Sequence, residues 1–183
     1  MTSETRPTEE PAARRRMVEW SDPRLTARAG RGRSGLEFLR ALMTDEVPRP
    51  PIVSLLGMEM VSAEAGQVIM RMGAGEHLYN PIGTVHGGAL ATLLDSVMGC
   101  AVHSVLPEGR GYTTLEIKVN YLRPVTEASG VVTAVGEVVH AGRQQAVAEG
   151  RVTDAEGRLC ATASTTCLLF DLPEAPLLVT PPD

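Results

Sequence analysis

The sequence predicts an α+β domain in which a six-stranded antiparallel sheet wraps around one long central helix. Residues 86–105 form a long apolar stretch opened by two glycines and followed by proline and glycine, as expected of a buried helix. Two segments with strand composition precede this stretch and four follow it. A helix that is apolar almost all round must be covered, and four consecutive antiparallel strands can curl around it.

The six strands are expected to be short segments separated by turn residues. They are residues 58–64, 67–72, 112–122, 130–140, 144–154 and 158–170. The turn at Ala65-Gly66 joins the first two strands, and residues 76–85 are expected to be irregular with one short turn. Together with the helix they form a core domain over residues 51–171.

The two ends of the chain are expected to lie outside this core domain. Residues 1–50 are interpreted as a mobile N-terminal arm, because the first 33 are poor in apolar residues and rich in Arg, Glu and Pro. Ser34 is a plausible N-cap for one short helix over residues 35–44, which nearby prolines end. Residues 172–183 contain four prolines and are interpreted as a tail.

Composition narrows the classes of protein that the chain could represent. Its net charge of −5 shows no basic excess, which argues against a nucleic acid partner. No apolar run approaches the roughly 20 residues that span a bilayer, so no membrane association is expected. The three cysteines are odd in number and lie in apolar runs, which indicates reduced thiols and a cytoplasmic location. No Cys/His cluster has the spacing of a metal site.

A glycine-rich turn opens the long helix, and a single carboxylate lies inside it. The turn runs from Asn80 to His86-Gly87-Gly88, and Asp95 follows seven residues after Gly88. The first N–H groups of a helix lack internal partners and lie at the positive end of its dipole, so they suit an oxygen that gains negative charge. An oxyanion site and a carboxylate base are what water needs to attack a carbonyl group.

Small and polar residues share one line of this helix. Gly88, Thr92, Asp95, Gly99 and His103 recur at spacings of four, three, four and four residues. This arrangement predicts that the line borders a cleft. A structural alternative remains open, in which the aspartate bonds to the threonine or to a neighbouring subunit.

Several separated motifs of residues 50–170 resemble those of the PaaI-like hotdog-fold thioesterases. They are Asn80-x-x-Gly-x-Val-His-Gly-Gly, Leu94-Asp95, Gly111-Tyr-Thr-Thr-Leu-Glu116, Asn120-Tyr-Leu-Arg-Pro124 and Gly142-Arg143. The resemblance implies hydrolysis of an acyl-CoA to a carboxylic acid and CoA, with no metal or other cofactor. It also implies a homodimer with its long helices side by side, which usually forms a homotetramer.

The resemblance assigns roles to five residues. Asp95 would be the general base or the nucleophile, and the Gly87 N–H would bind the thioester oxygen. Asn80 and His86 match residues that place or polarise the carbonyl group, and a histidine at a helix start is more often a cap than a base. Thr114 is the best match for the hydroxyl that holds the water, with the adjacent threonine as a second candidate.

Five further residues are expected to bind substrate: Gly88, Thr92, Ser96, Arg123 and Arg143. The two arginines would meet the phosphates of CoA, or would be solvated charges at strand ends. Along the helix, Asp95 lies about 10 Å from Gly88, which is too far for both to act on one thioester. Two antiparallel helices across a twofold axis would bring Asp95 of one subunit near Gly87 of the other, so shared active sites are predicted.

Two other functions compete with hydrolysis. A non-catalytic acyl-CoA-binding regulator would use the basic Arg14-Arg15-Arg16 segment on nucleic acid, although the arm shows no helix-turn-helix pattern. A hydratase or dehydratase acting on a thioester ranks lower, because the acid lies deep in the helix behind His-Gly-Gly.

Overall fold

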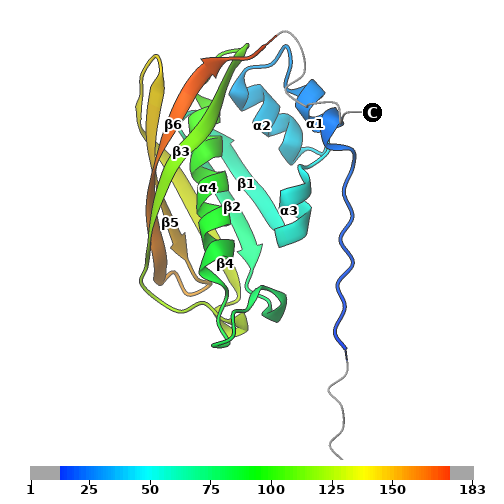
Figure 1. The fold of residues 1–183 in the computed structure, drawn as a ribbon, viewed down its shortest axis with the longest axis vertical. Helices are drawn as coiled ribbons and strands as arrows, with labels where there is room; N and C mark the ends of the chain where they lie inside the picture. Colours follow the sequence, from blue (N-terminus) through cyan, green and yellow to red (C-terminus); the bar gives the residue numbers. More distant parts are fainter. Residues whose placement is uncertain (1–12, 174–183) are drawn as a thin grey trace, which may run out of the picture.

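The computed structural model describes residues 13–173 and confirms the six-stranded antiparallel sheet with one long helix (Figure 1). The strand order is β1-β2-β4-β5-β6-β3. The strands are β1 (Met58–Glu64), β2 (Gln67–Gly73), β3 (Arg110–Tyr121), β4 (Val131–Ala141), β5 (Gln145–Thr153) and β6 (Leu159–Asp171). The largest difference from the predicted boundaries is at the start of β3, which begins at residue 110 instead of 112.

The long helix α4 (Gly87–Ser104) packs into the curve of the sheet. Its fully buried side chains include Leu93, Leu94, Val97 and Met98, which fill the core between helix and strands. Glycines on the sheet let the helix come close. At Gly136 in β4, an added Cβ would lie 2.5 Å from the Val97 carbonyl oxygen. Two 3₁₀ turns, η1 (Glu76–Leu78) and η2 (Glu127–Ser129), complete the core, and η1 is the short turn expected before the helix.

Between residue 13 and the first strand, three helices precede the sheet. The predicted short helix is observed as α2 (Gly35–Met43), with Ser34 as its N-cap in a capping box with Glu37. Two more were not predicted, α1 (Pro23–Ala29) and α3 (Pro51–Leu56). In both of them a proline begins the helix, where its missing N–H costs nothing. Pro51, which begins α3, was predicted only to end the preceding helix.

The α2 helix packs against α4 and β1, and Leu39 and Val47 of this region are buried. Residues 35–50 therefore form part of the same packed structure as the sheet. The predicted division of the chain at residues 50 and 171 stays a prediction. Residues 1–12 of the predicted arm and 174–183 of the predicted tail lie outside the described range. Between residues 13 and 173, no helix has both the length and the apolar character needed to cross a bilayer.

Candidate active site

Asp95 lies midway along α4 and faces the edge strand β3. The Thr114 hydroxyl donates a hydrogen bond to Asp95 Oδ1 over 2.9 Å. Thr113 is exposed, because adjacent residues of a strand point to opposite faces of the sheet. The structure thus pairs Asp95 with Thr114 and turns the second candidate threonine away. Among the described residues no Lys or Arg forms an ion pair with Asp95.

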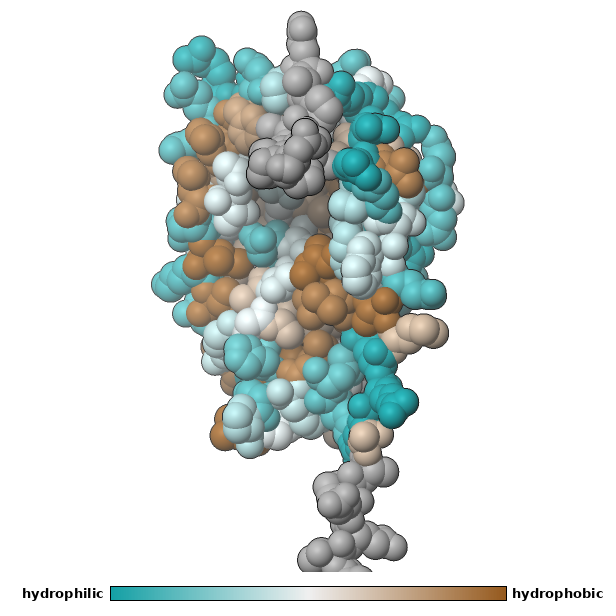
Figure 2. Space-filling model, turned by 45° about the vertical axis from the view of Figure 1, so that its right-hand side comes forward, coloured by the Kyte–Doolittle hydropathy of each residue, from teal (hydrophilic) through white to brown (hydrophobic). Residues whose placement is uncertain are grey.

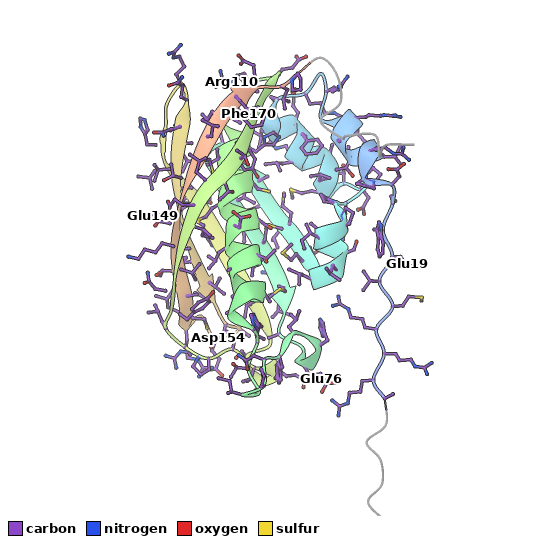
Figure 3. All side chains as sticks on the ribbon, viewed as in Figure 1. Glu19, Glu76, Arg110, Glu149, Asp154 and Phe170 are labelled. Atoms are coloured by element: carbon purple, nitrogen blue, oxygen red, sulfur yellow. The ribbon has the colours of Figure 1, made fainter. Side chains whose placement is uncertain are left out.

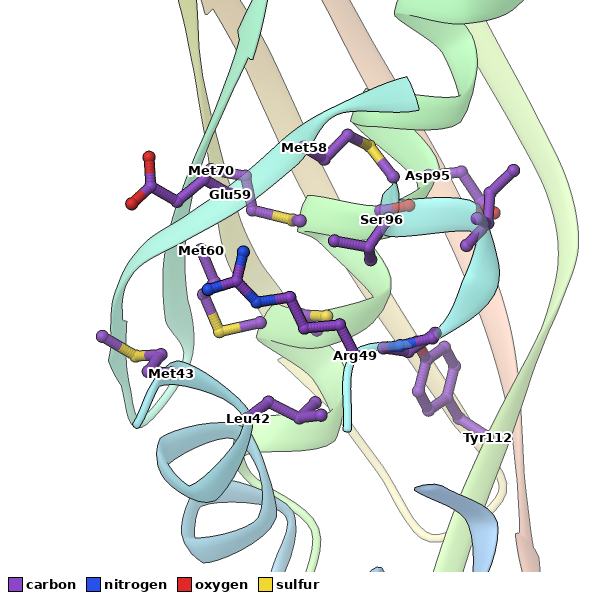
Figure 4. A pocket seen from close by; sticks show the side chains of 14 residues that line it. Leu42, Met43, Arg49, Met58, Glu59, Met60, Met70, Asp95, Ser96 and Tyr112 are labelled. Carbon is purple, nitrogen blue, oxygen red and sulfur yellow. The ribbon is translucent and has the colours of Figure 1, made fainter. Parts of the chain in front are cut away.

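An apolar cavity of about 220 Å³ opens beside the Asp95 carboxylate (Figure 4). Its walls come from α2, α3, the first two strands, α4 and β3. They are formed by Leu42, Met43, Arg49, Pro50, Ile52, Val53, Met58, Glu59, Met60, Met70, Asp95, Ser96, Cys100 and Tyr112. Ser96, predicted to bind substrate, is one of these residues. The cavity therefore places a carboxylate next to a space suited to an apolar group.

The side chains nearest the carboxylate on the cavity wall are uncharged at neutral pH. Burial raises the pKa of the Cys100 thiol to about 12, and the nearby Asp95 charge acts in the same direction. Burial likewise raises the pKa of Tyr112 well above its ordinary value. Within residues 13–173, no three His, Cys, Asp or Glu side chains are grouped so that they could hold a metal ion.

The glycine-rich turn is held by hydrogen bonds on both sides of the peptide between Gly87 and Gly88. The Gly88 N–H donates to His86 Nδ1 over 2.8 Å, and the Tyr121 hydroxyl donates to the Gly87 carbonyl over 2.8 Å. Because His86 Nδ1 accepts, the neutral imidazole carries its proton on Nε2. An added Cβ at Gly87 would lie 3.0 Å from the Tyr121 ring, so a larger residue here would have to displace this side chain. His86 is thus a capping residue of α4.

The Gly87 N–H is the donor that this arrangement leaves available. Within the described part of the chain, no acceptor is bonded to it. It is the first N–H of an 18-residue helix, at the positive end of the helix dipole. This N–H can therefore bind an oxygen that carries developing negative charge.

The other polar side chains near the turn are engaged within the protein. Asn80 Oδ1 accepts from the N–H groups of Ile82 and Thr84, and its Nδ2 donates to the Thr84 hydroxyl over 3.1 Å. The Thr92 hydroxyl donates to the Gly88 carbonyl over 2.9 Å. Asn80 consequently shapes the turn in this structure, while its predicted role at the substrate carbonyl stays a prediction.

The predicted site residues form two separate groups within the chain. Asp95 and Ser96 lie midway along α4, with Thr114 of β3 bonded to Asp95, whereas Asn80, His86, Gly87 and Gly88 lie in the glycine-rich turn and at the start of the helix. Gly87 and Asp95 are eight residues apart on the helix, about 12 Å along its axis. A base, a water and a carbonyl carbon span only about 6 Å. One chain therefore does not bring both groups to a single thioester.

The two predicted phosphate-binding arginines lie at opposite ends of β3. The Arg143 carbonyl accepts a hydrogen bond from Arg110, the first residue of the strand, over 2.7 Å. Arg123 lies two residues after the end of the strand and lines a second hollow together with Asn80 and Gly87. Figure 3 shows Arg110 at one end of the molecule and Glu76, which precedes the glycine-rich turn, at the other. Only Arg123 lies near the start of α4.

Three features of the site were not predicted. Tyr121 belongs to one of the motifs, yet no role was assigned to it before its bond to Gly87 was seen. Tyr112 was also missed, and the individual methionines of the cavity wall were not named. Since the methionines come from α2, β1 and β2, no local spacing in the sequence places them together.

Comparisons with known proteins agree with this geometry. Residues 82–161 match the Thioesterase superfamily. The 1,4-dihydroxy-2-naphthoyl-CoA hydrolase of Listeria monocytogenes is 30% identical over 111 residues, 60% of this chain and 89% of that protein. A thioesterase structure from Haemophilus influenzae is 29% identical, with a TM-score of 0.65 over 76% of this chain and 92% of that one. The E. coli PaaI protein, 21% identical, shares the fold with a TM-score of 0.66 over 76% of this chain and 99% of that one. The chain belongs to the thioesterase superfamily and is a hotdog-fold thioester hydrolase.

Proposed function

We propose that this protein hydrolyses acyl-CoA thioesters to a carboxylic acid and CoA. The observation that carries the proposal is the Asp95 carboxylate, bonded to Thr114 on the wall of an apolar cavity. A carboxylate with one oxygen held by a hydroxyl has its second oxygen free to bind and deprotonate water. The cavity beside it has room for an acyl group.

The reaction needs a base that activates water, a donor that binds the thioester oxygen, and a leaving group that departs without a general acid. Asp95 accepts a proton from water, and the water oxygen attacks the thioester carbonyl carbon. The Gly87 N–H stabilises the oxygen of the tetrahedral intermediate, a contribution of about 3 kcal/mol for such a donor. When the intermediate collapses, the carbon–sulfur bond breaks and CoA leaves as the thiolate, which takes up the proton. This sequence requires no metal or other cofactor.

The adjacent threonines provide a matched test of this proposal. Wild-type protein is expected to release free thiol from acyl-CoA, and Thr114→Val should lower kcat about tenfold or more, since a hydrogen bond to a charged group is lost. Thr113→Val should leave kcat unchanged, because this side chain points away from Asp95. The readout is free thiol over a panel of acyl-CoAs. Equal activity in both variants would remove Thr114 from the site, and no thiol release by the wild type would end the proposal.

We also propose a homodimer, or a homotetramer built from such dimers, in which each active site is shared between subunits. Three features support it. The two groups of site residues are about 12 Å apart in one chain. Strand β3 is an edge of the sheet, with Leu115 54% exposed on it. Figure 2 shows apolar side chains gathered on either side of a shallow hollow, which a second subunit could cover.

A complementation experiment tests the shared site. Asp95→Asn and Gly87→Val are each expected to be inactive as homodimers. Co-expressed with two different affinity tags and purified on both, the mixed dimer should have about half of wild-type activity, since one of its two shared sites keeps both residues intact. If the two residues acted within one chain, the mixed dimer would contain no complete site and would be inactive.

The proposal includes a cytoplasmic location and no nucleic acid partner. All three cysteines are free thiols, which supports a reducing compartment. Arg14 pairs with Glu76, and Arg16 donates to the Leu55 carbonyl over 3.0 Å. These guanidinium groups bind the protein itself, which argues against the regulator that uses them on nucleic acid. Cell fractionation tests the location, and a gel shift with genomic fragments tests the absence of nucleic acid binding.

A further inference from the structure

The cavity beside Asp95 is closed by a part of the chain that precedes the residues matched to the thioesterase superfamily. The match begins at residue 82, whereas most of the cavity wall is formed before that residue, by α2, α3, β1 and β2. Figure 4 shows Leu42 and Met43 on one side of the cavity, with Asp95 across from them. Most of the cavity wall therefore lies outside the matched residues, and part of it comes from the helices α2 and α3.

These helices are fixed in place by contacts that a loose arm would lack. The Gly35 N–H donates to the Leu106 carbonyl over 3.0 Å, and an added Cβ at Gly35 would lie only 1.7 Å from the His103 carbonyl oxygen. Phe38 packs edge-on against the His103 ring, with centroids 5.7 Å apart. At the other end, α3 runs through Gly57 directly into β1. The part of the cavity wall formed by α2 and α3 thus has a fixed position relative to α4.

The chemistry of the wall suits a flexible alkyl chain. Met43, Met58, Met60 and Met70 line it, and methionine side chains adapt to irregular apolar shapes. Among the described residues that line the wall, Tyr112 is the single aromatic one, so a planar ring would find little to stack on. Apart from Asp95, the charged residues of the wall face solvent: Glu59 is exposed, and the exposed Arg49 pairs with Asp45 over 3.0 Å.

We propose that α2, α3 and the segment between them (residues 35–56) form the closed end of the acyl pocket and select straight aliphatic acyl groups of about six to eight carbons. This inference rests on the proposed acyl-CoA hydrolysis. A cavity of about 150 Å³ holds benzene, which has six carbons, so a cavity of about 220 Å³ has room for an alkyl chain of about eight carbons. A longer chain would have to displace α3.

Two residues of α3 provide the test. Val53 lines the cavity, whereas Leu55 on the same helix is exposed and does not. For wild-type protein, kcat/KM should rise roughly two- to fourfold per added methylene up to octanoyl-CoA and fall for dodecanoyl-CoA. Val53→Phe should lower kcat/KM for octanoyl-CoA about tenfold or more, with butanoyl-CoA changed less than about twofold. Leu55→Phe should keep the wild-type profile.

A second variant separates a change in pocket size from a loss of folding. Val53→Ala enlarges the cavity and should shift the preferred chain towards decanoyl-CoA, opposite to the effect of Val53→Phe. If all variants hydrolyse the same chain lengths as the wild type, or if phenylacetyl-CoA exceeds octanoyl-CoA, the inference is overturned while hydrolysis stands. If the wild type hydrolyses no acyl-CoA, the proposed function fails. In that case the pocket is tested by calorimetry of octanoyl-CoA binding. If the pocket is correct, Val53→Phe binds octanoyl-CoA about tenfold more weakly than Leu55→Phe does.

Discussion

Replacing Asp95 by Asn is expected to lower kcat for acyl-CoA hydrolysis by about a thousandfold while the fold stays intact. The amide has the same shape as the carboxylate, and its oxygen can still accept the hydrogen bond that the Thr114 hydroxyl now donates over 2.9 Å. It cannot accept a proton from water at neutral pH, so only the base is removed. Free-thiol release under saturating substrate measures kcat, and urea unfolding measures the stability.

A matched substitution controls for the loss of one negative charge. Asp171 lies at the end of β6, and its side chain is 86% exposed and paired with Arg110. Asp171→Asn should leave kcat unchanged. If Asp95→Asn kept more than about a tenth of wild-type kcat, the aspartate would have a structural role, the alternative that the sequence left open. A large loss of stability in this variant would point to the same conclusion.

The fold could be predicted because its main elements differ strongly in pattern. An 18-residue apolar helix and six segments bounded by turns have only a few compact arrangements, and the strand boundaries were found to within two residues. Helices α1 and α3 could not be predicted in this way. They have only seven and six residues, and short helices are stable mainly through the tertiary packing that no local pattern shows.

The candidate site could be predicted in part for a similar reason. Asp95 and the glycine-rich turn lie in one continuous segment, so a carboxylate base and an oxyanion site could be suggested from the residues, while their individual roles came from the family resemblance. The hydrogen bond between Thr114 and Asp95 depends on which face of β3 meets α4. Thr113, the preceding residue of the strand, points to the opposite face and is exposed. The acyl cavity combines α2, α3, β1 and β2 with α4, and only the folded chain brings these segments together.

Gly136→Ala is expected to lower the free energy of unfolding by about 3 kcal/mol, the upper end of the range for overpacking. An added Cβ would lie 2.5 Å from the Val97 carbonyl oxygen and 2.9 Å from the Met98 nitrogen. These are backbone atoms in the middle of α4, so the whole helix would have to move. The measurement is urea or thermal unfolding at one fixed protein concentration, because oligomerisation adds to the apparent stability.

The same substitution at two other sheet glycines separates this cause from a general effect of alanine in a strand. Gly150 is the register partner of Gly136. An added Cβ at Gly150 would meet the flexible side chains of Met98 and Leu94 at 3.0–3.1 Å. Gly150→Ala is therefore expected to lower the free energy of unfolding by about 1 kcal/mol. An added Cβ at Gly73 would have no described neighbour within 4 Å beyond the adjacent residues, and alanine should cost nothing. Equal stabilities for all three variants would show that the helix position is not set by these glycines.

The displacement of α4 expected in Gly136→Ala should affect catalysis as well as stability. Val97 lies two residues after Asp95, so a displacement of α4 at Gly136 moves the carboxylate relative to Thr114 and to the cavity wall. A misplacement of about 1 Å can lower the rate of an enzyme about a hundredfold. Gly136→Ala should therefore reduce kcat even where the protein remains fully folded, whereas Gly73→Ala should not. The glycine under the helix would then fix the position of the base as well as the packing of the core.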